Sequence, residues 1–339
     1  MKLKNDVPLE QLRDGLEELI PRRMKEENVP GLSIVVVKNA EIFWSRVFGV
    51  ANAESREPIT ANTIFSAQSL SKPVFAYAAL KLHERGLIDL DTPLIEYTAK
   101  PYLPDDHHLG EITMRHVLSH TCGFPNWRPK GKFLKTLFTP GERFSYSGEG
   151  FKYLGTVIEE VLGKQLDDFM RENVLGPFGM GGGYIWRDEL CGMATAHDGD
   201  GKPWGVKRWK EANPAASLCC SAVDYAMFLC EFMQPGKDEH HLSEATTVEM
   251  LRPHVSVYFS ISWGLGLGIQ HTSQGDAFWQ WGQGSVESGG YQNFVTGFRD
   301  RGLGVVVMTN SSQGLMICED MVSEAIGGEH PAFSDYLGI

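Results

Sequence analysis

The sequence lacks the patterns that mark several large classes of protein. No part of the chain has the roughly 18 consecutive apolar residues that a membrane-spanning helix needs. The N-terminal stretch MKLKNDVPLEQLRDGLEELI does not show the charged and then apolar pattern of a secretory signal. No serine lies in a GxSxG nucleophile elbow, and GLGLG (264–268) matches neither the GxGxxG nor the P-loop pattern. We therefore expect a cytoplasmic protein that is neither an α/β-hydrolase nor a nucleotide-binding enzyme.

Cysteine is scarce and is not arranged for disulfides or metal binding. None of the six cysteines belongs to a CxxC pair. Two of them are adjacent, a spacing that rarely forms a disulfide. We expect reduced, partly buried thiols, as in a cytoplasmic protein. The six are Cys122, Cys191, Cys219, Cys220, Cys230 and Cys318.

Basic residues are too few for a nucleic-acid or membrane surface. The chain has 31 Lys and Arg against 43 Asp and Glu, so its formal net charge is −12. A surface of this sign repels phosphate backbones and anionic lipid, and we expect neither as a partner. The 339 residues, of which 42% are hydrophobic, are enough for one large domain or two closely packed domains.

The two ends of the chain carry strand patterns. Residues 32–52, LSIVVVKNAEIFWSRVFGVAN, are rich in β-branched and aromatic residues and predict two strands with a short turn between them. Residues 293–310 repeat this strand–turn–strand pattern. Helices are predicted at 8–27 and from about 316 to 326, where apolar residues recur at helical spacing.

The middle of the chain is predicted to be mainly helical. SKPVFAYAALKLHERG (71–86) and GEGFKYLGTVIEEVLG (148–163) are helix patterns that each end on a glycine. An irregular stretch rich in Gly and Trp (176–215) precedes a further helix near 222–233. The simplest architecture is an antiparallel sheet built from both chain ends and flanked by helices, with a mainly helical region inserted.

Ser69 and Lys72 form the strongest catalytic candidate. Three residues apart at the start of a predicted helix, their side chains face the same way. A serine hydroxyl becomes nucleophilic when a neighbouring base takes its proton, and a buried lysine with a lowered pKa can be that base. The helix N-terminus adds backbone N–H groups that favour developing negative charge. SxxK spacing alone is common, so the interpretation depends on the sequence around it.

That surrounding sequence resembles the serine β-lactamase-like family, which also includes penicillin-binding proteins. The similarity lies in FSAQSLSKPVFAYAALKLHERGLIDLDTPL, ITMRHVLSHTCGFP, TPGERFSYSGEGFKYLG, NPAASLCCSAVDYAMFL and GLGVVVMTN, in this order. The family includes class C β-lactamases, D-Ala-D-Ala carboxypeptidases, D-aminopeptidases and family VIII carboxylesterases. The resemblance implies an α+β fold of the β-lactamase/transpeptidase type. It places a sheet domain at 1–60 plus 250–339 and a mainly helical domain at 61–249, with the active site at their interface.

The resemblance also implies the second proton-handling group. The family's Tyr-x-Asn element aligns with Tyr146-Ser147-Gly148, so Tyr146 would assist proton transfer. A phenol becomes a usable base only beside a cation, and Lys72 is the expected one. Gly148 replaces the asparagine that helps to hold the lysine and the amide group of the substrate. This departure weakens the case for amide or lactam substrates.

The family's third element, Lys-x-Gly or His-x-Gly on a strand, aligns best with Gln280-Trp281-Gly282. The backbone N–H of Gln283 would then join that of Ser69 in the oxyanion hole. Gln280 stands where the family has a cation that meets the carboxylate of penicillins and peptide C-termini. We therefore expect weak recognition of anionic substrates.

Several other residues have both a structural and a functional interpretation. Glu149 and Glu287 could lie near the site or at the surface. Aromatic residues of the irregular segments could form an apolar substrate pocket or pack in the core. They are Trp127, for which we expect substrate contact, together with Phe124, Tyr184, Trp186, Trp204, Trp209, Trp279 and Trp281.

The sequence therefore predicts a serine hydrolase that works through an acyl-enzyme, most simply a carboxylesterase for small to medium neutral esters. No metal or organic cofactor is expected. A β-lactamase or D-amino-acid peptidase would use the same residues, and a catalytically silent binding protein could keep the fold. His116 and His120, four residues apart, could hold a metal in a metallohydrolase, but packing and hydrogen bonding explain them better. The oligomeric state does not follow from the sequence.

Overall fold

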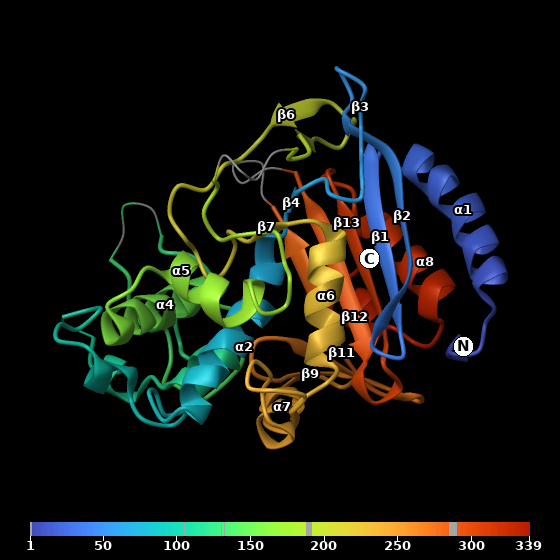
Figure 1. Ribbon diagram of the computed structural model, residues 1–339. Helices are drawn as coiled ribbons and strands as arrows, with labels where there is room; N and C mark the ends of the chain where they lie inside the picture. Colours follow the sequence, from blue (N-terminus) through green and yellow to red (C-terminus); the bar gives the residue numbers. More distant parts are fainter. Residues whose placement is uncertain (1, 105, 130, 132, 188–191, 285–289) are drawn as a thin grey trace.

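One antiparallel sheet organises the molecule (Figure 1). The computed structural model describes residues 2–104, 106–129, 131, 133–187, 192–284 and 290–339, and within them the sheet has nine strands in the order β3-β2-β1-β13-β12-β11-β10-β9-β8. The strands are β1 (Gly31–Lys38), β2 (Glu41–Asn52), β3 (Glu57–Pro58), β8 (Val255–Tyr258), β9 (Ile261–Trp263), β10 (Gly268–Thr272), β11 (Gly275–Gln283), β12 (Gln292–Phe298) and β13 (Leu303–Thr309).

The centre of this sheet joins the two ends of the chain. Strand β1 pairs with β13, and Ile34 lies opposite Val307. The hairpin β1–β2 and the hairpin β12–β13 are the two strand pairs that the sequence predicts. The predicted α+β fold, with an antiparallel sheet built from both chain ends, is confirmed.

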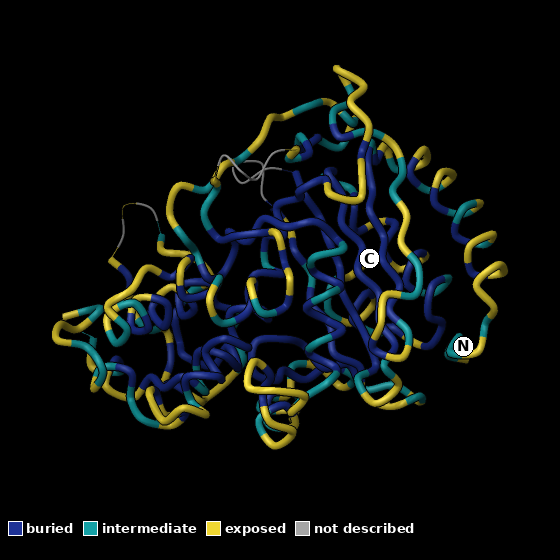
Figure 2. The backbone as a smooth tube through the Cα atoms, in the orientation of Figure 1, coloured by how far each residue is buried: buried dark blue, intermediate teal, exposed yellow. Residues whose placement is uncertain are grey.

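Strand β1 carries apolar side chains on both of its faces because helices cover both faces of the sheet. Ile34 and Val36 pack in the cluster that includes α1 (Leu9–Glu26) and α8 (Leu315–Ile326). Val35 and Val37 point to the other face, where the cluster includes α6 (Ala222–Phe232). The central strands are correspondingly dark in Figure 2, whereas the outer side of α1 is exposed.

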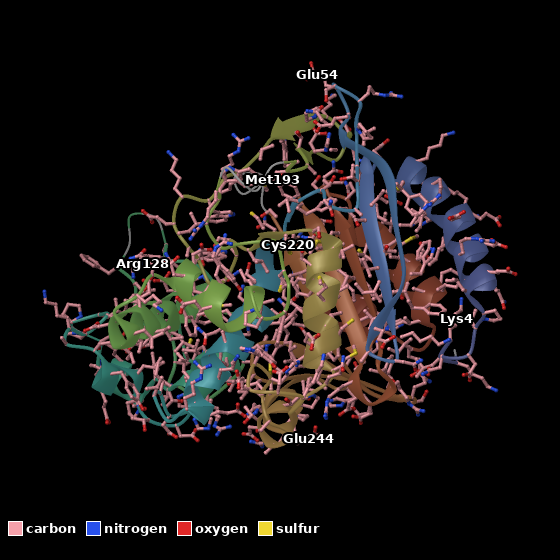
Figure 3. All side chains as sticks on the ribbon, in the orientation of Figure 1. Lys4, Glu54, Arg128, Met193, Cys220 and Glu244 are labelled. Carbon is pink, nitrogen blue, oxygen red and sulfur yellow. The ribbon has the colours of Figure 1, made fainter. Side chains whose placement is uncertain are left out.

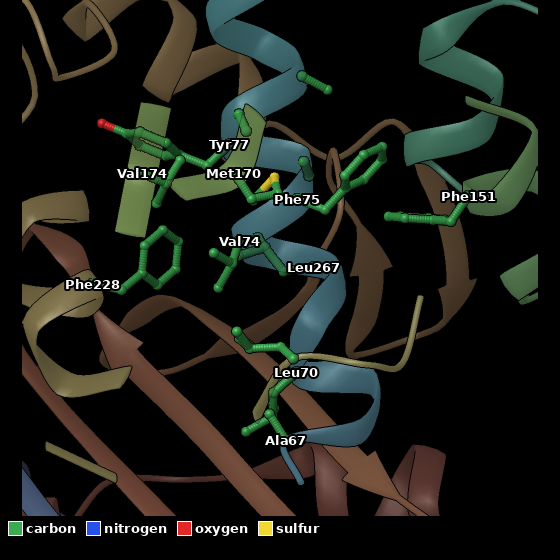
Figure 4. Close-up of a cluster of buried hydrophobic side chains, with 14 of the residues drawn as sticks. Ala67, Leu70, Val74, Phe75, Tyr77, Phe151, Met170, Val174, Phe228 and Leu267 are labelled. Carbon is green, nitrogen blue, oxygen red and sulfur yellow. The ribbon is translucent and has the colours of Figure 1, made fainter. Parts of the chain in front are cut away.

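Helix α2 (Ser71–Glu84) is the centre of the helical part. Its residues from Ser71 to Leu82 are all buried, as expected of a helix that is surrounded on every side. Figure 4 shows Leu70, Val74, Phe75 and Tyr77 among side chains from neighbouring elements. The other helices here are α3 (Met114–Leu118), α4 (Gly148–Leu162), α5 (Leu166–Met170) and α7 (Glu244–Leu251).

Short elements complete the chain. Two small antiparallel pairs are β4 (Phe65–Ser66) with β7 (Cys219–Cys220) and β5 (Ala196–His197) with β6 (Pro203–Gly205). The single-turn helices are η1 (Gln68–Leu70), η2 (Leu94–Tyr97), η3 (Leu109–Glu111), η4 (Arg171–Leu175), η5 (Arg299–Arg301) and η6 (Ala332–Leu337).

The structure bears on two expectations, the absence of a membrane-spanning helix and the reduced state of the cysteines. No helix in the described ranges has both the length and the apolar character needed to cross a membrane. The five described cysteines are unpaired and buried, more deeply than the sequence suggested. Cys220 on β7 is labelled in Figure 3. Cys191 lies outside the described residues. The cytoplasmic location and the division into 1–60 plus 250–339 and 61–249 stay predictions.

Candidate active site

Ser69 lies in a tight turn between strand β4 and helix α2. The sequence predicted that Ser69 opens the long helix, but it occupies the 3-10 turn η1, and α2 begins two residues later at Ser71. Gln68, directly before it, has a left-handed φ of 54°, a conformation that costs energy for a side chain with a Cβ. The Ser69 side chain is partly exposed, so a ligand can reach its hydroxyl.

Hydrogen bonds from several elements hold this turn in place. Ser71 Oγ donates to the carbonyl of Gln68 at 2.6 Å and accepts the N–H of Leu218 at 2.9 Å. The Tyr225 hydroxyl donates to the carbonyl of Leu70. From the sheet, Asn293 Nδ2 on β12 donates to the carbonyl of Ser66 at 3.0 Å. The strained backbone before Ser69 is therefore fixed by both the helical part and the sheet.

Lys72 directs its amine at Ser69. The Lys72 Nζ lies 3.1 Å from Ser69 Oγ and 2.9 Å from the carbonyl oxygen of Ala215. The side chain is 0% exposed, and burial lowers the pKa of Lys72 to about 7. Both of its hydrogen-bond acceptors are uncharged, and among the described residues no ion pair with Lys72 opposes this effect of burial. Near neutral pH a large fraction of the amine is therefore unprotonated, with its lone pair available to the serine hydroxyl.

Tyr146 lies beside this pair in an aromatic environment. The Lys72 Nζ lies over the Tyr146 ring, 4.7 Å from its centroid. Burial raises the pKa of Tyr146, and hydrogen bonds with Ser69 and Gln280 oppose that shift only in part. Burial thus shifts the pKa of this phenol away from the range of a usable base, and the role of Tyr146 in proton transfer stays a prediction. At neutral pH the phenol keeps its proton and can donate it.

Strand β11 brings Gln280-Trp281-Gly282 to the same place. The fully buried Gln280 donates from Nε2 to the Tyr146 hydroxyl at 2.9 Å and to the Ser69 carbonyl at 3.3 Å. The Trp281 ring packs on that of Tyr146 with centroids 4.8 Å apart. A Cβ at Gly282 would lie 2.3 Å from the carbonyl oxygen of Ala67, so only glycine lets the strand approach the turn this closely.

Gln283 ends strand β11 directly after this contact. It is exposed, and its Cα is in register with that of Gln292 on β12. The role of its backbone N–H in the oxyanion hole stays a prediction.

Trp127 occupies the space that a longer side chain at position 148 would need. A Cβ at Gly148 would lie 2.8 Å from two carbon atoms of the Trp127 indole and 2.9 Å from the carbonyl oxygen of Asn126. The indole is also 5.8 Å from Lys72 Nζ and is 45% exposed. Asn126 fixes this arrangement, because its Oδ1 accepts the N–H of Gly148 at 3.0 Å. The Trp127 indole can thus take this position only because residue 148 is a glycine.

The remaining aromatic and acidic candidates differ in burial. Trp204 is exposed, and Trp186 and Trp209 are half-buried. Phe124, Tyr184 and Trp279 are fully buried and belong to the cores rather than to a substrate pocket. Glu149 is also buried, and its Oε1 accepts bonds from the Tyr102 hydroxyl at 2.6 Å and from Arg128, which Figure 3 labels. Glu287 lies outside the described residues.

His116 and His120 make different contacts, which fit packing and hydrogen bonding. His116 belongs to a capping box with Thr113, whose N–H donates to His116 Nδ1 at 3.3 Å. His120 is fully buried, and its Nδ1 accepts the N–H of Ser147 at 2.9 Å. Within the described part of the chain no group of three His, Cys, Asp or Glu side chains is placed to hold a metal ion.

Sequence reasoning missed two contributors to this site. The carbonyl of Ala215 holds the Lys72 amine, and a backbone carbonyl leaves no signal in residue identity. Gly266, in the GLGLG stretch, has a φ of 94°, and a Cβ there would lie 2.2 Å from the Cβ of Ala76 on α2. Glycine at position 266 therefore lets this loop pass against the helix that carries Lys72.

Comparison with known proteins identifies the family. A family model described as Beta-lactamase matches residues 16–317. The chain belongs to the β-lactamase family. Members of this family that resemble it include a β-lactamase of Pseudomonas fluorescens, 27% identical over 69% of this chain and 68% of that protein. Esterase EstB of Burkholderia gladioli is also 27% identical, over 56% of this chain and 55% of the esterase, so the match spans about half of that relative.

Solved structures of the β-lactamase family show the same fold. The octameric penicillin-binding protein homologue of Pyrococcus abyssi superposes with a TM-score of 0.75 at 26% identity, over 89% of this chain and 74% of that one. EstCE1, a hydrolase with promiscuous acyltransferase activity, gives 0.78 at 19% identity, over 94% and 99%. At 19% identity, the likeness to EstCE1 supports the fold alone. The broad class of the chain is thus a β-lactamase-family serine hydrolase.

Proposed function

We propose that this protein is a carboxylesterase that hydrolyses small to medium neutral esters through an acyl-enzyme on Ser69. Ser69 Oγ attacks the ester carbonyl carbon, and its proton passes to the neutral amine of Lys72. The tetrahedral intermediate then collapses, its C–O bond to the alcohol breaks, and the departing alkoxide takes up a proton. A water molecule next attacks the acyl-enzyme, which releases the carboxylic acid and restores the Ser69 hydroxyl.

The proton transfers are divided between Lys72 and Tyr146. The Lys72 amine, with its pKa lowered to about 7, is suited to accept the Ser69 proton across the 3.1 Å contact. The Tyr146 hydroxyl, whose pKa is raised, is suited to donate its proton to the leaving alkoxide and to regain one from Lys72. This division follows from burial, which favours the neutral form of both groups.

The developing oxyanion would be held by the backbone N–H groups of Ser69 and Gln283. Support comes from Gly282, whose close approach to Ala67 brings the end of β11 beside the turn that carries Ser69. Loss of one such donor typically lowers the rate by about 10²–10³-fold.

The preference for neutral esters rests mainly on one observation, the buried Gln280 amide where the family has a cation. Gln280 donates to the Tyr146 hydroxyl and offers no positive charge to a substrate carboxylate. Gly148 in turn leaves no side-chain amide to bind the amide of a lactam or peptide. Trp127 and Trp281 instead offer apolar surface near Lys72 and Tyr146, which suits an acyl or alcohol group. The name of esterase EstB is consistent with this choice.

A competition among three substrates tests the proposal. The protein is first incubated with a fluorophosphonate, and peptide mass mapping should place the label on Ser69. Turnover of a short p-nitrophenyl ester is then compared with that of nitrocefin and a D-alanyl dipeptide, with Ser69→Ala as the control. We expect the ester to be hydrolysed with the highest kcat/KM and Ser69→Ala to be inactive.

Three results would contradict the proposal. Faster cleavage of nitrocefin or of the D-peptide would make the enzyme a β-lactamase or D-amino-acid peptidase, the second candidate, which the Pseudomonas fluorescens relative favours by name. An unlabelled Ser69 would indicate a binding protein without catalysis. Loss of ester hydrolysis on treatment with a chelator would indicate a metallohydrolase.

A further inference from the structure

His120 forms hydrogen bonds with the two residues that flank Tyr146 in the sequence. The N–H of Ser145 donates to the His120 carbonyl at 2.8 Å, and the N–H of Ser147 donates to His120 Nδ1 at 2.9 Å. One residue therefore accepts hydrogen bonds from the backbone N–H groups of both residues that flank the tyrosine. His120 and Ser147 are buried and Ser145 is half-buried, so solvent competes little for these two hydrogen bonds.

The imidazole ring also supports the phenol ring directly. The centroids of His120 and Tyr146 are 4.2 Å apart, with the rings inclined by 30°. Phe151 lies 5.2 Å from the imidazole at a similar inclination, and Trp263 meets its edge. The phenol is thus packed on a ring that is itself held by other aromatic side chains.

The hydrogen bonds define the chemical form of His120. Because Nδ1 accepts a hydrogen bond, the proton of the neutral ring is on Nε2, which is buried and has no partner among the described residues. Burial, and then the positive charge of Lys72, lower the pKa of His120 well below its ordinary value. A protonated ring would lose the acceptor that Ser147 uses.

The backbone of His120 is also held in an uncommon conformation. Its φ is 57°, in the left-handed region that a residue with a Cβ adopts only when its surroundings impose it. This conformation lets one residue present both its carbonyl and its ring to the segment around Tyr146. His116, four residues earlier, has no such role, since its ring caps the start of α3.

We propose that His120 is a positioning residue that fixes the Tyr146 hydroxyl between Ser69 and Gln280 for proton transfer. The inference rests on the proposed function of Tyr146. His120 exchanges no proton with the substrate and acts only through the placement of the phenol. It therefore affects the chemical step rather than substrate binding.

Two substitutions that tolerate the left-handed backbone separate the contributions. His120→Asn keeps a side-chain acceptor for Ser147 and loses the ring, whereas His120→Gly loses both. We expect His120→Gly to lower kcat for a p-nitrophenyl ester on the order of 10²-fold, with KM changed only a few-fold. His120→Asn should recover about tenfold of that loss. His116→Asn is the matched control and should keep the wild-type kcat.

Combination with Tyr146→Phe distinguishes positioning from a general effect on the fold. If His120 acts only through the tyrosine hydroxyl, His120→Gly should reduce kcat no further in a Tyr146→Phe background. Thermal unfolding of each variant shows that the protein is folded at the assay temperature. Equal losses of kcat in both backgrounds, or an Asn variant no better than Gly, would overturn the inference.

The same samples distinguish a failure of the proposed His120 role from a failure of the esterase proposal. Fluorophosphonate labelling of wild-type Ser69 tests the acyl-enzyme alone. Labelled wild-type protein together with a His120→Gly variant of unchanged kcat would refute the role of His120 and leave the esterase proposal standing. Unlabelled wild-type protein would refute the esterase proposal, and the role of His120 would fall with it.

Discussion

The side-chain amide of Gln280 donates a hydrogen bond from Nε2 to the hydroxyl oxygen of Tyr146 over 2.9 Å. The Tyr146 oxygen therefore accepts a hydrogen bond on one side and can donate its own hydrogen to another partner. The Oε1 of the same amide is buried and has no partner among the described groups. Gln280 thus positions the Tyr146 hydroxyl through Nε2 although its own Oε1 is left without a partner among the described groups. It does so without a charge.

Replacing Gln280 by lysine should shift the substrate preference towards anions. A charge-assisted hydrogen bond contributes roughly 1.5–3 kcal/mol, which corresponds to about 10–100-fold in relative kcat/KM. We expect the ratio of nitrocefin to p-nitrophenyl ester turnover to rise by that factor in Gln280→Lys. Gln274→Lys, in the turn between β10 and β11, adds the same charge away from the site and should leave the ratio unchanged. An unchanged ratio in Gln280→Lys would show that position 280 does not meet substrate.

The pH dependence of ester hydrolysis should report Lys72. The amine must be neutral to accept the Ser69 proton, so kcat/KM should be low at acid pH and rise through an apparent pKa of about 7. Because the phenol of Tyr146 must keep its proton, activity should not fall again at mildly alkaline pH. A profile of kcat/KM against pH with a non-ionising ester measures this. A midpoint near the ordinary lysine pKa would mean that the amine is solvated.

Lys72→Met should lower the activity but raise the stability at neutral pH. We expect kcat to fall by about 10²–10⁴-fold, as is typical on loss of a general base. The pKa of this lysine is lower in the folded than in the unfolded protein, so between the two values the unfolded chain binds more protons. The free energy of unfolding of the wild type therefore rises with pH above about 7, and the full penalty is present below it.

The methionine variant lacks this titration. At neutral pH the penalty is roughly 3–5 kcal/mol, and the lost hydrogen bond to Ala215 offsets about 1–3 kcal/mol of the gain. We expect Lys72→Met to be more stable at neutral pH by denaturant unfolding, by a margin that shrinks as pH rises. Lys81→Met, at a second buried lysine of α2 with a lowered pKa, should keep ester hydrolysis. A less stable Lys72→Met at neutral pH would contradict this account.

Much of the fold could be predicted from the sequence because it depends on local patterns. The apolar run of β1 and the turn after Lys38 specify a hairpin, and the structure has it with one residue of difference at its start. Helix α4 ends where Gly163 takes a left-handed φ of 59°, as its glycine predicts. These features are determined by neighbours in the chain.

The details of the site depend on contacts between distant segments and were less accessible. The distance between Lys72 and Ser69 follows from helical spacing, but the direction of the Tyr146 pKa shift depends on how deeply other elements bury the phenol. Trp279 and Trp281 lie on the same face of β11 with ring centroids 5.8 Å apart, yet it is Trp281, nearer the end of the strand, whose ring packs on Tyr146. Such distinctions require the packed structure.

The contact between Trp127 and Gly148 predicts that substitutions at the two positions are coupled. Gly148→Asn alone forces its Cβ to within 2.8 Å of the indole, and overpacking of this kind costs about 1–3 kcal/mol. Trp127→Ala removes the indole and opens that space, although the Asn126 carbonyl remains close. We therefore expect the double variant to be more stable than the sum of the single effects predicts, by about 0.5–3 kcal/mol.

Denaturant unfolding of the four proteins measures this coupling, and Gly110→Asn is the matched control because a Cβ there meets nothing within 4 Å. The substrate profile gives the functional half of the test. Since the double variant has both space and a side-chain amide beside Lys72, it should gain nitrocefin turnover relative to ester turnover, and neither single variant should do so. Strictly additive stabilities would show that the indole does not occupy the place of the missing asparagine, and the account of Gly148 as the partner of Trp127 would then be wrong.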